Sequence, residues 1–123
     1  MYKKSVQEIK RSQKESLLLR ELSNLFLRII IEDKELEGLS ITSIKLSPDS
    51  SRCTVFFYSA GGSDEFDRLR PRLVLYKPSL RKSLSRSLAL RHTPDLRFKY
   101  DKQIEKQHEI EYLLNKIKTE EQS

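Results

Sequence analysis

The chain has 123 residues, of which 37% are hydrophobic and 34% are charged, and its formal net charge is +6. This length fits one domain, because typical domains hold roughly 100 to 150 residues. No apolar run approaches the roughly 20 residues that cross a bilayer, and the start MYKKSVQEIK lacks the apolar segment of a signal peptide.

The first half of the chain predicts one helix followed by a β-hairpin. Apolar side chains recur at three- and four-residue steps through residues 4–31, without Gly or Pro, which predicts a long helix. β-Branched residues then mark residues 39–47 and 52–59 as strands. Only a short turn containing Pro48 and Asp49 separates them, so an antiparallel hairpin is the simplest interpretation.

The next segment has helical composition but contains a proline. Residues 65–77 follow a loop at 60–64, and Asp64 is the expected N-cap. Pro71 is interior if the helix begins near Asp64, and lies in the first turn if the helix begins later. Pro78 lacks an amide donor and clashes with the carbonyl four residues back, so we expect a kink at Tyr76-Lys77.

The last part of the chain predicts a helix, a strand and a final helix. Residues 79–91 form the first of these, residues 96–100 the strand, and residues 102–119 a helix with one apolar face. That face comprises Ile110, Leu113, Leu114 and Ile117. Helices that cover one face of a sheet predict an α+β sandwich of two layers. We expect one domain over residues 1–118 and a short polar tail at 119–123.

The positive charge is concentrated in one segment. Of the 24 Lys and Arg, eight lie between Asp67 and Asp95, where there is no acid. The remaining 16 are fewer than the 18 Asp and Glu, so the rest of the chain carries a formal charge of −2. Such asymmetry favours a polyanionic partner, either a nucleic acid or an anionic membrane.

The helix at 79–91 has a leucine face and a basic face. Leu80, Leu84 and Leu88 lie together on the helical wheel and are expected to pack on the sheet. Lys82 and Arg86 lie opposite, and Arg81 lies on the flank. A solvated helix face is the alternative, but such faces usually mix charges of both signs. A membrane-surface role is also open, although the core needs the leucine face.

Other residues have weaker functional signals. In residues 96–100, Arg97 and Lys99 alternate with apolar residues; a basic strand face binds RNA or simply discourages edge aggregation. His92 either reaches phosphate or base, or only interacts favourably with a helix C-terminus. His108 is expected at the surface of the last helix. Of the adjacent aromatic residues Phe56, Phe57 and Tyr58, at least one is expected in the core. Base stacking by Tyr58 is the less favoured alternative.

We find no pattern typical of an enzyme, a metal site or a cofactor site. Two histidines and one cysteine lie in unrelated segments without zinc-ligand spacing, and there is no GxSxG or Walker motif. Cys53 begins a β-rich run and is expected to be a packing residue. A single cysteine cannot form an internal disulfide, so a reducing, cytoplasmic location is expected.

Short sequence motifs and their order resemble the bacterial ribosome-binding factor A family over roughly residues 4 to 118. These motifs are Ser47-Pro48-Asp49 after the first strand, LALR at 88–91 and TPDLRFKYD at 93–101. The resemblance implies a type II KH-like fold. Ordinary KH domains carry a GxxG loop, which is absent, and the family's Ala-x-Gly kink corresponds to Tyr76-Lys77-Pro78. Bulky Tyr76 disfavours backbone contact with RNA there, so basic side chains are the better candidates, whereas Ser47 and Asp49 are expected to shape the hairpin turn.

The resemblance implies a non-enzymatic assembly factor that binds small-subunit ribosomal RNA late in maturation and matters most for growth in the cold. Its expected partners are the small ribosomal subunit and its precursors, with no membrane and no cofactor, and the protein is expected to be a monomer. The expected RNA-binding residues are Lys77, Arg81, Lys82, Arg86, Arg91, Arg97 and Lys99, with Lys3, Lys4, Lys10 and Arg11 as a second group. The alternatives are a ribosomal protein or hibernation factor bound to mature ribosomes, and a hydrolase acting on RNA.

Overall fold

The computed structural model describes residues 5–122 and has the predicted order of helices and strands. The elements are α1 (Val6–Glu32), the short 3-10 helix η1 (Lys34–Leu36), β1 (Leu39–Leu46), β2 (Arg52–Ser59), α2 (Gly62–Val74), α3 (Lys77–Leu88), β3 (Asp95–Tyr100) and α4 (Lys102–Glu121). Position 4, the predicted start of the first helix, lies outside the described residues. The final helix extends two residues beyond 119, so most of the predicted polar tail is helical.

The three strands form one sheet in the order β1-β2-β3. β1 and β2 are antiparallel, which confirms the predicted hairpin, and β3 is parallel to β2. A parallel neighbour needs a crossover connection, which α2 and α3 supply. In the order β1-β2-β3, β3 is an edge strand, and the helices α2 and α3, which carry most of the basic run, pack next to it.

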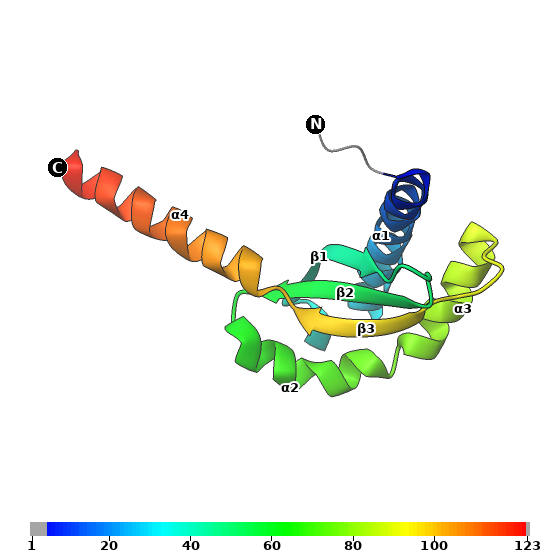
Figure 1. Ribbon diagram of the computed structural model, residues 1–123. Helices are drawn as coiled ribbons and strands as arrows, with labels where there is room; N and C mark the ends of the chain where they lie inside the picture. The colour runs from blue at the N-terminus through cyan, green and yellow to red at the C-terminus, as the bar shows by residue number, and fades with distance from the viewer. Residues whose placement is uncertain (1–4, 123) are drawn as a thin grey trace.

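The helices α1, α2 and α3 cover one face of the sheet, and the core lies between the two layers. In β2, buried residues alternate with half-buried ones, so Phe57 points to the helices and its neighbours Phe56 and Tyr58 point to the opposite face. The Phe57 ring lies 5.4 Å from that of Phe26 on α1 and 5.6 Å from that of Phe98 on β3. In Figure 1, α1 passes behind the strands.

The predicted kink between α2 and α3 is confirmed. α2 ends at Val74 and α3 begins at Lys77, so Pro78 lies in the first turn of α3, where its missing N–H leaves no helical bond unmade. α2 begins at Gly62, earlier than predicted, which places Pro71 inside the helix. The predicted cap was wrong: Gly61 occupies the N-cap position and Asp64 lies in the first turn, where its charge still favours the helix dipole.

The basic helix ends earlier than predicted. Ala89 adopts a left-handed conformation, with φ of 50°, and its N–H donates to the carbonyl of Ser85, which closes α3 at Leu88. Arg91 therefore lies in the loop that leads to β3, rather than in the last turn of the helix.

The last helix projects away from the sandwich (Figure 1). Asp101 caps it by accepting a bond from the Ile104 N–H at 3.0 Å. No residue of α4 is buried, so the predicted apolar face is exposed, with Leu113 at 56% of its surface. Only the first turns of α4 reach the sheet, where His108 makes an edge-to-face contact with Tyr58.

Candidate nucleic-acid interface

A basic groove lies between the edge strand β3 and the junction of α2 with α3. Its volume is about 320 Å³. It is lined by Arg70, Val74, Lys77, Asp95, Arg97, Phe98 and Lys99. Four cations and one carboxylate give the groove a net positive lining, and the free edge of β3 adds unpaired backbone groups. A phosphate backbone therefore fits its charge.

The groove brings together three predicted site residues that are far apart in the sequence. Arg97 and Lys99 come from β3, and Lys77 comes from the start of α3. The Lys77 ammonium lies 5.7 Å from the centroid of the Phe98 ring, a cation–π contact that positions it beside the strand. Arg70 on α2 was missed as a site residue, although it belongs to the acid-free basic run that the sequence reveals.

The basic residues of α3 have two different environments. The Arg81 guanidinium donates to the carbonyls of Thr93 and Pro94, at 3.1 and 3.2 Å, and so ties α3 to the start of β3. Lys82 and Arg86 are exposed on the side of α3 that faces away from the core. Arg81 thus has a positioning role in the fold, whereas Lys82 and Arg86 present charge to the solvent. Arg91 is also exposed, in the following loop.

A buried carboxylate anchors the kink. Asp33, at the end of α1, is only 7% exposed and accepts hydrogen bonds from Arg72 and Tyr76. The Arg72 Nε lies 2.9 and 2.7 Å from the two carboxylate oxygens, and the Tyr76 hydroxyl lies 2.9 Å from Oδ2. The bond from Arg72 is the main reason that the pKa of Asp33 lies below its ordinary value. The Tyr76 hydroxyl bond therefore ties the kink, directly before Lys77, to the end of α1.

Replacing the Asp33 carboxylate is expected to make the free energy of unfolding change less as the pH falls into the acid range. In Asp33→Asn the shape is kept but the charge is lost. Because the folded pKa of Asp33 is lowered, its contribution is full above the ordinary value of 3.8 and is lost as the pH falls through the lowered pKa. The variant should be less stable than the parent at pH 7, and the difference should shrink below pH 3.8. Urea unfolding at a series of pH values measures this.

The matched control for Asp33→Asn is Asp67→Asn, which removes an exposed carboxylate on α2. It should unfold like the parent at pH 7. A difference between Asp33→Asn and the parent that stays constant down to the acid limit would contradict the ion-pair explanation.

The hairpin turn is organised by Asp49, as predicted. Its Oδ1 accepts bonds from the hydroxyls of Ser47 and Ser51, at 2.8 and 2.7 Å, and from the Ser51 N–H at 3.1 Å. These bonds, that of Ser51 first, lower the pKa of Asp49 to about 2. All three contacts lie within the turn, so the structure supports a role in shaping the chain.

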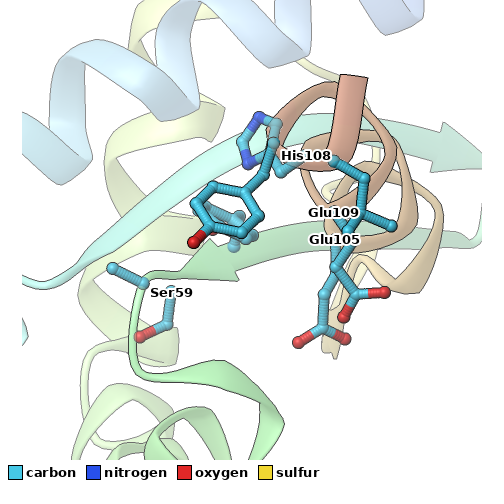
Figure 2. Close-up of a pocket in the computed structure, with 8 residues that line it drawn as sticks. Ser59, Glu105, His108 and Glu109 are labelled. Atoms are coloured by element: carbon cyan, nitrogen blue, oxygen red, sulfur yellow. The ribbon is translucent and has the colours of Figure 1, made fainter. Parts of the chain in front are cut away.

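A second hollow, of about 440 Å³, lies where α4 leaves the sheet. Figure 2 shows Glu105, Glu109 and His108 around it, with Ser59 at the end of β2. Burial, followed by the charge of Glu105, raises the pKa of Tyr100 to about 12, and its hydroxyl lies 3.2 Å from both Glu105 Oε1 and the Ser59 carbonyl. Two carboxylates in its lining make this hollow unfavourable for phosphate.

The remaining predicted residues lie outside the groove. Cys53 is fully buried, which confirms a packing role, and burial raises the pKa of its thiol to about 12. Lys10 and Arg11 line a separate surface hollow beside the hairpin turn, while Lys3 and Lys4 lie outside the described residues. His92 and His108 are both exposed.

The described part of the chain holds neither a metal cluster nor a membrane span. No three His, Cys, Asp or Glu side chains within residues 5–122 are placed to share a metal ion. None of the helices in that range combines the length and apolar character needed to cross a bilayer.

The chain matches the family model for ribosome-binding factor A over residues 10–114. It is 32% identical over 114 residues to ribosome-binding factor A of Geotalea uraniireducens, covering 93% of each chain. The corresponding protein of Geobacter metallireducens is 35% identical over 113 residues, covering 91% of this chain and 95% of that relative.

Solved structures of similar proteins share this fold. The crystal structure of ribosome-binding factor A from Thermus thermophilus matches with a TM-score of 0.62 and 26% identity, over 73% of this chain and 93% of that one. A homology model of the Thermus thermophilus factor, fitted into a cryo-EM map of a 30S–RbfA complex, matches with a TM-score of 0.56 and 27% identity, over 70% of this chain and 89% of that one. The predicted α+β, type II KH-like fold is confirmed.

Proposed function

The chain belongs to the ribosome-binding factor A family, and we propose that it is a non-enzymatic assembly factor that binds small-subunit ribosomal RNA during late maturation of the small ribosomal subunit. Its partners would be the small subunit and its precursors. It would act in the cytoplasm as a monomer, without a cofactor.

The basic groove is the observation that carries this proposal. Arg70, Lys77, Arg97 and Lys99 line one cleft beside an edge strand, and Lys82 and Arg86 extend the positive surface along α3. Phosphate contacts from Lys and Arg supply most of the sequence-independent affinity for RNA. The likeness to a Thermus thermophilus factor that was fitted into a map of a 30S complex supports the small subunit as the source of that RNA.

The residues at the kink indicate that RNA would be bound by side chains, because the GxxG loop of KH domains is absent. In KH domains that loop clamps the nucleic-acid backbone through close approach of the main chain. Here Tyr76 and Pro78 occupy the kink, and the Tyr76 hydroxyl is engaged by Asp33. Side-chain cations around the groove would therefore replace main-chain contacts.

Sedimentation of the tagged protein with lysate from cold-grown bacteria tests the proposal. An assembly factor should migrate with free small subunits and their precursors and be absent from polysomes. Persistence in polysomes would favour a component or regulator of mature ribosomes. Migration at the top of the gradient, away from all ribosomal particles, would overturn the proposal. Intact RNA after incubation with the pure protein would agree with a non-enzymatic role.

A further inference from the structure

The sheet face that the helices leave uncovered carries an aromatic ring between polar and basic side chains. Phe56 points to this face from the central strand β2. Its register partners are Ser43 on β1 and Lys99 on β3. One row further along the strands, Thr54 lies between Lys45 and Arg97.

Cations dominate this face. Two hollows lie on it, of about 240 Å³ and about 600 Å³, and both include Lys45 and Lys99 in their lining. The first also includes Arg52 and Arg97, and the second Lys102. Within residues 5–122, none of these five side chains forms an ion pair.

The one carboxylate in the lining is already engaged. Asp101 is 9% exposed, and its two oxygens accept bonds from the Thr42 hydroxyl at 2.6 Å and from the Ile104 N–H at 3.0 Å. Thr42 lies at a bulge that shifts the register between Ile41 and Ser43, and its hydroxyl also lies 3.3 Å from the Phe56 carbonyl oxygen. The buried carboxylate therefore caps α4, and the solvent-facing charge of the sheet is positive.

Among the aromatic rings that line this face in residues 5–122, Phe56 is the one that no other ring contacts. Tyr58 is covered by His108, whose ring centroid lies 4.7 Å away, and it stacks with Tyr100 at 6.2 Å. Phe56 is half-buried and contacts no other aromatic ring in the described part of the chain. Phe56 lines the larger hollow together with its register partner Ser43.

We infer that this sheet face binds a single-stranded segment of RNA, with one base stacked on Phe56. The five cations that surround the ring would hold the phosphates on either side of that base: Lys45, Arg52, Arg97, Lys99 and Lys102. Base stacking on an aromatic side chain combined with a positive surface is the general basis of single-strand binding. The bases of a duplex are already stacked on one another, so the ring selects unpaired RNA.

This inference rests on the proposed function and extends it, because the sheet face adds a second RNA contact to the groove and α3. Arg97 and Lys99 border both the groove and the sheet face, so they cannot separate the two. Phe56 and Lys45 line only the sheet face, and Lys82 and Arg86 belong only to α3. Variants of these two pairs test the two contacts independently.

The first experiment measures the affinity of the full chain for a single-stranded oligouridine of about ten nucleotides, within the range bound by one single-strand module. Phe56→Leu keeps an apolar side chain but removes the aromatic face, and it should weaken binding about fivefold or more. Phe56→Trp should keep the affinity, because the indole also stacks. Affinity for a duplex of the same length should be equal in all three proteins.

Binding of oligouridine by Phe56→Leu with the parental affinity would overturn the inference, and so would an equal loss for oligouridine and duplex. If Phe56→Leu does not fold, Lys45→Ala combined with Arg52→Ala replaces it, because both side chains are exposed. That double variant should lose affinity for oligouridine, and unchanged affinity would overturn the inference.

The two RNA contacts also fail in distinguishable ways. Loss of small-subunit binding in Lys82→Ala/Arg86→Ala, with parental affinity of Phe56→Leu for oligouridine, would leave the proposed function standing and remove the sheet contact. The reverse pattern would support the sheet contact and remove the proposed role of α3.

Discussion

Phe57→Ala is expected to lower the free energy of unfolding by about 3 to 5 kcal/mol, the usual cost of removing a buried aromatic ring. Phe57 is 1% exposed and its ring lies within 6 Å of the rings of Phe26, Phe66 and Phe98. Its loss leaves a cavity where both layers of the sandwich meet. Urea unfolding followed by circular dichroism measures the change.

The adjacent residue provides the control for Phe57→Ala. Phe56 is half-buried on the uncovered face, so Phe56→Ala removes fewer contacts and should cost clearly less stability. The two substitutions are chemically identical and one position apart. Equal losses in the two variants would mean that the faces of β2 are not assigned correctly.

Lys82→Ala combined with Arg86→Ala is expected to weaken binding to small-subunit ribosomal RNA about 20-fold near physiological salt, if each side chain neutralises one phosphate. The slope of log affinity against log salt should fall by about 1.4 to 1.8, because two fewer counterions are released. Both side chains are exposed and face away from the core, so folding should be unchanged. Arg81 is left in place because it ties α3 to the start of β3.

The matched control for the α3 variant is Lys116→Ala with Lys118→Ala. This pair removes the same charge from exposed positions on the projecting helix α4. It should change affinity and salt slope much less than the α3 variant. Parental affinity in a folded Lys82→Ala/Arg86→Ala protein would contradict a role of α3 in RNA binding, and equal losses in both double variants would indicate a general effect of net charge.

Local sequence patterns predicted most of the helices and strands, because turns, helix breaks and helix caps depend on residues that are close together in the sequence. Two runs of β-branched residues joined by a Pro-Asp turn predicted the hairpin of β1 and β2, which the structure confirms. Pro78 predicted the break before α3 from sterics alone. The start of α1 also had a readable signal: Ser5 and Glu8 form a capping box that marks Val6 as the first helical residue.

Helix ends were less predictable where the backbone uses unusual conformations. α2 begins at Gly62, two residues before Asp64, and Gly62 has a φ of 83° that side chains rarely tolerate. Ala89 ends α3 in the left-handed region, although alanine favours helix. No local preference of Ala89 indicates that α3 ends there. The early end of α3 places Arg91 in a loop.

By itself, the sequence determined that the protein has an α+β fold, a kink and an acid-free run of eight cations. Only the tertiary structure shows which of those cations line a groove, which face the solvent and which bond to the backbone. Parallel pairing of β3 with β2 formed the groove of Arg70, Lys77, Arg97 and Lys99, and Asp33 anchored the kink through partners 39 and 43 residues away. Such contacts depend on how distant segments pack, and a periodicity of two or 3.6 residues carries no information about packing over that range.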